Sequence, residues 1–170
     1  MSDVSNSRLF EEFKGIQSIK DALIVLIKTE WNAEIVDELE KGCLRIASQY
    51  RISTKTVVVP GAVEIPLVAQ LLAKENKHQA IICLGAVIRG ETTHYNYVCE
   101  QVSEGCQRVM LDYSIPVIFG VLTTENEEQA QDRVGGAHGH KGKDAVDAAI
   151  TMVNIVNQLT TKQDVSIGYY

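Results

Sequence analysis

Nearly continuous apolar segments alternate along the chain with segments in which apolar residues recur at helical spacing. The apolar segments, typical of strands buried on both faces, cover residues 22–28, 56–60, 80–88 and 116–122. Helical spacing, helped by a capping pattern at 124–127, predicts helices over residues 32–47, 64–74, 94–111, 124–134 and 142–159. Strand and helix therefore follow one another almost throughout.

This alternation predicts a parallel sheet with helices on both faces. Because crossovers between parallel strands are right-handed, few topologies remain. We expect an α/β fold of the flavodoxin-like class, a three-layer α/β/α sandwich around a four-stranded parallel sheet. One domain is expected over residues 21–160, between an N-terminal tail (1–20) that packs late or against a neighbour and a C-terminal tail (161–170).

Composition narrows the possible functions. The chain has 170 residues, of which 45% are hydrophobic and 22% charged, and such values are ordinary for a globular protein. The net charge of −6 argues against non-specific nucleic-acid binding, although a few local cations could still hold an anionic substrate. We expect no membrane span, because no apolar run approaches the ~20 residues that one requires. The polar start lacks the features of a signal peptide, which favours a cytoplasmic protein.

The cysteines and histidines do not predict a metal site. The four cysteines form no CxxC pair, and Cys43 and Cys83 fit core positions. His138 and His140 form an HxH pair with no obvious third ligand. No dinucleotide-binding, P-loop or serine-hydrolase motif is present, so neither a metal nor a cofactor is expected.

Chemically versatile residues cluster in the loops that follow the predicted strands. Ligands of open parallel sheets bind at this edge, beyond the carboxyl ends of the strands. The segment 89–94 leaves a buried strand and opens a long helix, whose free N–H groups and positive dipole end favour a phosphate. His94 lies in the first turn of that helix and titrates near neutrality, so it can transfer protons. Trp31, after the first strand, could stack on a flat heterocycle.

Each of these residues also has an ordinary interpretation. Gly90 and a threonine suit any turn and helix cap, and a core position explains Trp31 equally well. Phe119 lies in mid-strand, where a core residue is the better interpretation. Arg133 and Lys141 flank a glycine-rich stretch, and their positions alone favour solvated cations on a flexible loop.

The ordered set of segments resembles the lumazine synthase family of riboflavin biosynthesis. The matching residues are 31–32, 59–66, 84–98, 116–126, 128–130, 133 and 141–142. The resemblance implies a transferase that condenses 5-amino-6-(D-ribitylamino)uracil with 3,4-dihydroxy-2-butanone 4-phosphate. The products would be 6,7-dimethyl-8-ribityllumazine, phosphate and water, and the step is the penultimate one of the pathway. No cofactor is implied.

The resemblance also implies a role for each candidate residue. His94 would transfer protons, and Trp31 would stack on the pyrimidine. The ribityl chain would lie against Ala62, Val63 and Glu64, and the rest of the pyrimidine pocket would be formed by Ala86, Val87, Ile88 and Phe119. The phosphate would be bound by Glu91, Thr92, Arg133 and Lys141. Phe119 and Arg133 would come from the adjacent subunit.

Assembly follows from the same resemblance. The family forms homopentamers with active sites between subunits, and many members build an icosahedral 60-mer shell. The resemblance also makes riboflavin synthase a candidate partner. Val63, Ala137 and His140 depart from residues that many relatives carry, so we expect the ribityl side of the pocket and the glycine-rich loop to differ from those of such relatives. Two alternatives remain open: a non-catalytic module that binds lumazine or flavin, and a shell protein with a vestigial pocket.

Overall fold

Four parallel strands form the centre of the computed structural model, which describes residues 23–161. The strands are β1 (Leu23–Thr29), β2 (Ser53–Val59), β3 (Ala80–Ile88) and β4 (Val117–Thr124). Their order across the sheet is β2-β1-β3-β4, and each neighbouring pair is parallel. β2 and β4 are therefore the edge strands.

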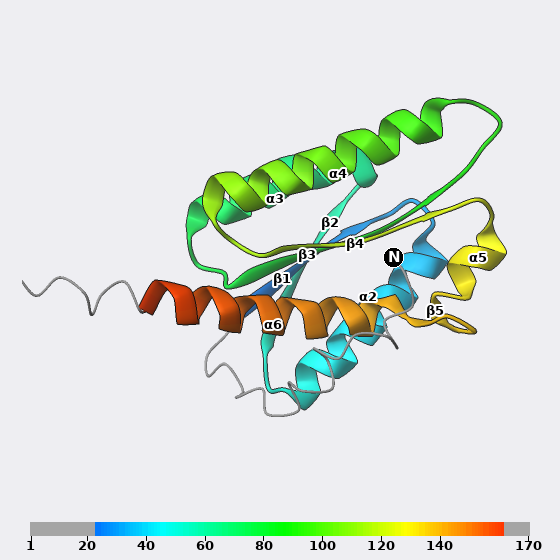
Figure 1. Ribbon diagram of the computed structural model, residues 1–170. Helices are drawn as coiled ribbons and strands as arrows, with labels where there is room; N and C mark the ends of the chain where they lie inside the picture. Colours follow the sequence, from blue (N-terminus) through cyan, green and yellow to red (C-terminus); the bar gives the residue numbers. More distant parts are fainter. Residues whose placement is uncertain (1–22, 162–170) are drawn as a thin grey trace, which may run out of the picture.

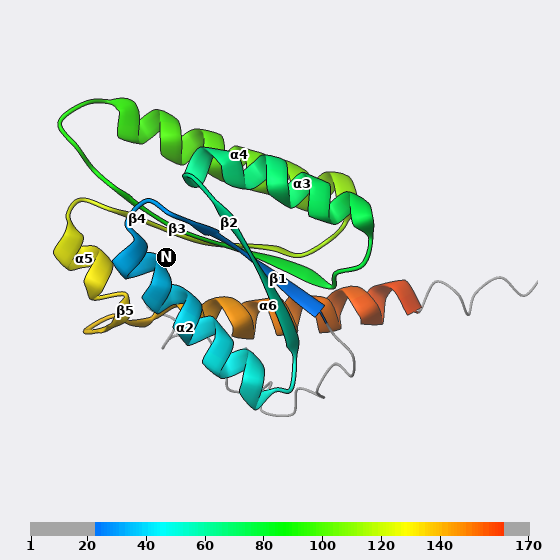
Figure 2. The same ribbon diagram turned by 180° about the vertical axis from the view of Figure 1, so that it is seen from behind.

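Helices cover both faces of this sheet. One face carries α2 (Ala33–Gln49) and α6 (Lys141–Thr161), and the other carries α3 (Ile65–Glu75) and α4 (His94–Tyr113) (Figures 1 and 2). A 3-10 turn, η2 (Ala62–Glu64), precedes α3, and the short helix α5 (Glu127–Gln131) follows β4. The predicted three-layer α/β/α sandwich is confirmed.

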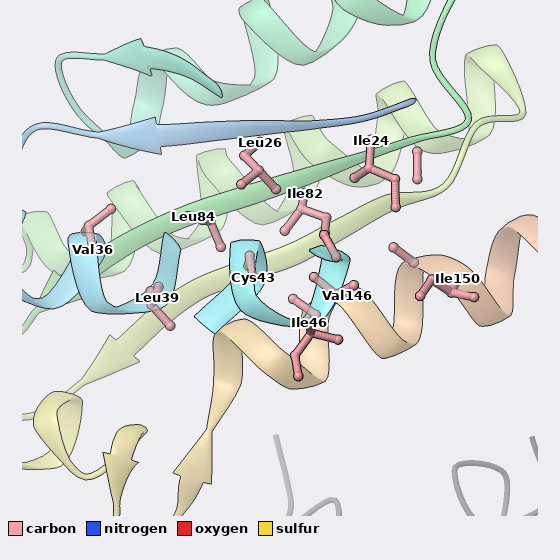
Figure 3. Close-up of a cluster of buried hydrophobic side chains, with 14 of the residues drawn as sticks. Ile24, Leu26, Val36, Leu39, Cys43, Ile46, Ile82, Leu84, Val146 and Ile150 are labelled. Atoms are coloured by element: carbon pink, nitrogen blue, oxygen red, sulfur yellow. The ribbon is translucent and has the colours of Figure 1, made fainter. Parts of the chain in front are cut away.

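Two hydrophobic clusters, one on each face, explain why the central strands β1 and β3 are almost entirely apolar. Alternate residues of β1 and β3, such as Leu26 and Ile82, point toward α2 and α6 (Figure 3). The intervening residues, such as Ile27 and Cys83, pack against α3 and α4. Cys43 and Cys83 are buried, as predicted for core cysteines.

The segment after β4 differs from its prediction. Thr124 still belongs to β4, and α5 is capped instead by Asn126, whose side chain accepts a hydrogen bond from the backbone N–H of Gln129 at 2.9 Å. The Gln129 side chain in turn accepts from the N–H of Glu125 at 3.0 Å, so the helix cap lies two residues later than expected. The helix ends at Gln131 rather than near 134.

The glycine-rich stretch is ordered by an antiparallel hairpin of β5 (Val134–Gly136) and β6 (Gly139–His140). The prediction of a loose loop was wrong here, because glycine allows the positive φ angles of 123° at Gly135 and 73° at Gly139. The predicted tail 1–20 and residues 162–170 lie outside the described residues. Within residues 23–161, no helix is long and apolar enough to cross a membrane.

Candidate functional site

A cleft of about 540 Å³ opens at the carboxyl edge of the sheet. It lies where the loops after β1 and β2 meet the end of β3 and the first turns of α4. Many residues predicted for a site line this cleft: Trp31, Ala62, Val63, Glu64, Ala86, Val87, Ile88 and His94. Further lining residues, absent from the prediction, are Asn32, Pro60, Gly61, Tyr97, Val98 and Gln101.

Trp31 presents its ring to solvent at the rim of the cleft. The side chain is 73% exposed, so the interpretation as a core tryptophan was wrong. The backbone of Trp31 is nevertheless fixed, because its N–H donates to the carbonyl of Pro60 at 3.3 Å and its carbonyl accepts from the Thr29 hydroxyl at 3.2 Å. A rigid backbone under an exposed ring suits stacking on a flat ligand.

Asn32 stands at the predicted helix cap but uses its side chain elsewhere. Its backbone is left-handed, with φ of 56°, and the side chain makes no capping hydrogen bond. The amide group instead donates to the carbonyl of Ala86 at 2.7 Å. This bond ties the loop after β1 to the end of β3 and so joins two walls of the cleft.

The turn between β2 and α3 positions a carboxylate. The backbone N–H of Gly61 donates to Oε2 of Glu64 at 3.0 Å, which closes the turn over η2. A Cβ atom at Gly61 would lie only 3.1 Å from that oxygen, so glycine leaves room for the contact. Glu64 lines the cleft, and its other carboxylate oxygen, Oε1, accepts no hydrogen bond from the described residues. It can accept a hydrogen bond from a hydroxylated ligand.

His94 is the first residue of α4, and its side chain is exposed in the cleft. Its backbone N–H donates to the hydroxyl of Thr92 at 3.3 Å, which fixes the turn before the helix. Tyr97, Val98 and Gln101 follow at positions three, four and seven from His94 and line the cleft with it. Helical periodicity could have identified all three, because residues at this spacing share one helix face.

Glu91 and Thr92 are exposed on the turn before α4 and line no described cavity. Their proximity to the helix start is compatible with binding an anion through backbone N–H groups. Behind this turn, burial raises the pKa of the Tyr95 phenol and of the Cys99 thiol, so both groups are neutral near pH 7. Neither group adds negative charge to the turn.

Phe119, Arg133 and Lys141 lie outside the cleft. They line a separate cavity of about 110 Å³ beside the edge strand β4, and the two cavities share no residue. The guanidinium of Arg133 donates to the carbonyl of Gln129 at 2.7 Å. Lys141 is only 6% exposed and forms an ion pair with Asp144 at 2.9 Å, so its interpretation as a solvated loop cation was wrong.

The described residues contain no group of three or more His, Cys, Asp or Glu side chains that could hold a metal ion. The residues that line the cleft supply an imidazole, a carboxylate, hydroxyl and amide groups, an aromatic ring and a helix N-terminus. This set can orient a flat heterocycle and move protons during an addition or an elimination at a carbonyl carbon.

Comparison with known proteins agrees with this chemistry. The family model described as 6,7-dimethyl-8-ribityllumazine synthase matches residues 21–157. A protein of that name from Coxiella burnetii (strain Dugway 5J108-111) is 50% identical over 139 residues, covering 80% of this chain and 92% of its own length. One from Protochlamydia amoebophila (strain UWE25) is 42% identical over 153 residues, covering 88% and 89%.

Among solved structures, a GDP-L-fucose synthetase from Naegleria fowleri bound to NADP is similar over 85% of this chain and 46% of its own, with 10% identity and a TM-score of 0.38. A likeness this weak carries no argument about the cleft.

Proposed function

The chain belongs to the 6,7-dimethyl-8-ribityllumazine synthase family, and we propose that the cleft beside His94 is the active site of that synthase reaction. The enzyme condenses 5-amino-6-(D-ribitylamino)uracil with 3,4-dihydroxy-2-butanone 4-phosphate. The products are 6,7-dimethyl-8-ribityllumazine, phosphate and two water molecules. One observation carries the assignment: a single cleft gathers His94 with Trp31, Glu64 and the end of β3.

The aminouracil binds first to the walls of the cleft. Its pyrimidine ring stacks on Trp31 and packs against Ala86, Val87 and Ile88, because these residues supply an aromatic face and an apolar floor. The ribityl hydroxyls donate to the free oxygen of Glu64 and bind backbone groups of Ala62 and Val63. The 3-10 turn supports this role, since it holds the Glu64 carboxylate in place.

His94 transfers the protons. The 5-amino group attacks the ketone carbon, and the resulting carbinolamine loses water to give an imine. Loss of a proton from the adjacent carbon then expels phosphate and leaves an enol, which tautomerises to a new carbonyl. Attack of the ribitylamino nitrogen on this carbonyl closes the ring with loss of a second water. The imidazole can accept a proton at one nitrogen and return it at each step.

The phosphate binds at the start of α4. This helix has 20 residues, and its first N–H groups together with the dipole favour an anion there. Glu91 contributes its backbone N–H and Thr92 its hydroxyl. Holding both substrates in one cleft supplies much of the acceleration, because the addition becomes effectively intramolecular.

Phe119, Arg133 and Lys141 act on the cleft of the adjacent subunit. Their separate position beside an edge strand supports this role, because within one chain they lie apart from the cleft. Repeated around a ring, such a head-to-tail contact supplies every cleft with both sets of residues. We propose a cytoplasmic homopentamer. The icosahedral 60-mer shell and a complex with riboflavin synthase extend the same proposal.

The direct test mixes the purified protein with both substrates and follows the appearance of the fluorescent lumazine. Replacement His94→Gln is expected to lower kcat by roughly 10²–10⁴-fold, the usual contribution of general acid–base catalysis. The matched control is His138→Gln, on an exposed residue that lines neither cavity. A wild-type protein that binds both substrates and forms no lumazine would be a binding module, and the proposal would fail.

Complementation tests the shared site. We expect His94→Gln and Arg133→Met to be nearly inactive as homo-oligomers, because every cleft lacks one essential group. After dissociation and co-assembly in equal amounts, roughly a quarter of the contacts unite an intact His94 with an intact Arg133 from the neighbour. Activity should therefore return to about that fraction of the wild-type value. If co-assembled mixtures showed only the average of the two variants, the sharing of sites would be refuted.

A further inference from the structure

Arg89 connects three segments around the start of α4. Its Nε forms an ion pair with Oε2 of Glu125 at 2.7 Å, in the turn after β4. A second guanidinium nitrogen donates to the side-chain oxygen of Asn96 at 3.1 Å, and the guanidinium carbon lies 4.1 Å from the centre of the Tyr95 ring. The backbone N–H of Arg89 donates to the carbonyl of Thr124 at 2.9 Å. One residue thus joins the end of β3, the first turn of α4 and the end of β4.

The turn enclosed by these contacts, residues 90–93, has little support of its own. All four of its residues are exposed, and they belong to no helix or strand. A Cβ atom at Gly90 would meet nothing within 4 Å, which shows how open the turn is. Two hydrogen bonds involve it: the N–H of His94 donates to the Thr92 hydroxyl, and the N–H of Asn96 donates to the Thr93 carbonyl. The ends of the turn are therefore held chiefly by Arg89.

The charges beside the turn 90–93 support the same role for Arg89. Glu125 is 59% exposed and lies beside the turn assigned to the phosphate, where an unpaired carboxylate would repel a dianionic group. Arg89 neutralises it with a planar guanidinium that is already occupied by Glu125, Asn96 and the Tyr95 ring. A guanidinium engaged in this way is poorly available as a phosphate ligand itself.

We propose that Arg89 is a positioning residue for the phosphorylated substrate: it fixes the turn 90–93 and neutralises Glu125 without contacting the substrate. The inference rests on the proposed function, since it assumes that the phosphate binds at the start of α4. The ion pair between Arg89 and Glu125, which links the loops after β3 and β4 of one chain, would then determine specificity for the phosphorylated substrate.

The test measures KM for each substrate separately in the assembled enzyme. Arg89→Met keeps an unbranched stem over Tyr95 and removes the charge and the hydrogen bonds. We expect a roughly tenfold rise in KM for the butanone phosphate, because the unpaired Glu125 carboxylate would repel the phosphate and the turn would lose its main support. The KM for the aminouracil and the melting temperature should stay unchanged. Arg89→Lys should lie between wild type and Arg89→Met, because lysine keeps the charge and loses the planar fork.

The double variant Arg89→Met/Glu125→Gln separates positioning from direct binding. In this double variant the raised KM for the butanone phosphate should fall part of the way back to the wild-type value, because the unpaired carboxylate is gone. Arg108→Met, which removes an exposed ion pair to Asp112 farther along α4, is the matched control and should behave as wild type.

Three outcomes would overturn the inference. The first is an unchanged KM for the phosphorylated substrate in Arg89→Met. The second is a parallel rise of both KM values with a lower melting temperature, which would indicate a merely structural role. The third is a double variant no better than Arg89→Met. Failure of the proposed function would look different, because the wild-type enzyme itself would then form no lumazine.

Discussion

Trp31 offers the sharpest separation between binding and folding. The residue is the single tryptophan of the chain and is 73% exposed at the rim of the cleft. If its ring serves to stack on the aminouracil, its removal should weaken binding far more than it weakens the fold. A core tryptophan would behave in the opposite way.

The magnitudes follow from exposure. A fully buried tryptophan removes up to ~250 Å² from water. Only about a quarter of the Trp31 surface is buried, so at ~25 cal/mol per Å² the replacement Trp31→Ala should cost at most about 1.7 kcal/mol of unfolding free energy. Loss of a stacking partner for a flat base costs ~1–3 kcal/mol, which corresponds to a roughly 5- to 150-fold weaker complex.

Two measurements on the same protein test this expectation. Quenching of the Trp31 fluorescence during titration with the aminouracil reports stacking directly in the wild type, because no other tryptophan contributes. Calorimetry then gives the dissociation constants of Trp31→Ala and of Trp31→Phe. The phenylalanine variant keeps a stacking ring and should retain most of the affinity. Urea unfolding of all three proteins supplies the stability comparison.

The reasoning would be refuted by an affinity that Trp31→Ala leaves within twofold of the wild-type value. A destabilisation well above the bound from exposure would refute it as well, since the ring would then contribute to a core or to a subunit contact. Affinity lost equally in Trp31→Phe and Trp31→Ala would show that size rather than stacking matters.

Two further predictions concern the fold around the site. A Cβ atom at Gly42 would collide with the imidazole of His140, so Gly42→Ala should destabilise the protein by about 1–3 kcal/mol in urea unfolding. Adding His140→Ala to the same chain should remove most of this destabilisation. If the destabilisation persists, the clash lies elsewhere. Burial raises the pKa of the Asp147 carboxyl, so its charged form destabilises the folded state above that pKa. Asp147→Asn should therefore raise the melting temperature at pH 7. This gain should vanish as the pH falls below 3.8, the ordinary pKa of aspartate, because Asp147 is then neutral in both the folded and the unfolded protein. A gain that is independent of pH would contradict this cause.

Much of the fold could be predicted because the central strands are buried on both faces. In β3 all residues from Ala80 to Ala86 are buried, and that uniform burial is what the continuous apolar run indicates. Helical spacing placed the start of α4 at His94 without error. Ends set by side-chain hydrogen bonds were less predictable. Asn126 and Thr124 both fit a helix cap. Asn126 is the cap in the structure, because Thr124 still belongs to β4 and its hydroxyl donates to the carbonyl of Asn126.

The side chains around the cleft could be predicted only where a local rule fixes their direction. Tyr97 and Gln101 follow from His94 by periodicity, and a search of that helix face would have found them. Asn32 could not be found in this way, because its left-handed backbone turns the amide group toward Ala86, a residue 54 positions away. The burial of Lys141 depends similarly on its ion pair with Asp144 and on the packing of α6.

If Phe119 and Arg133 serve the cleft of a neighbouring subunit, as we propose, the residues of one reaction do not form one pocket in one chain. Sequence order carries no information about which copy of a chain a residue serves, and within a single subunit these two side chains line a different cavity from His94. Phe119 lies in an edge strand, and an edge strand of a sheet is where another subunit can approach closely. The proposed closed ring would resolve the separation, because each subunit would then offer its cleft on one side and its β4 edge on the other. Loss of the ring should therefore abolish turnover even where every subunit remains folded.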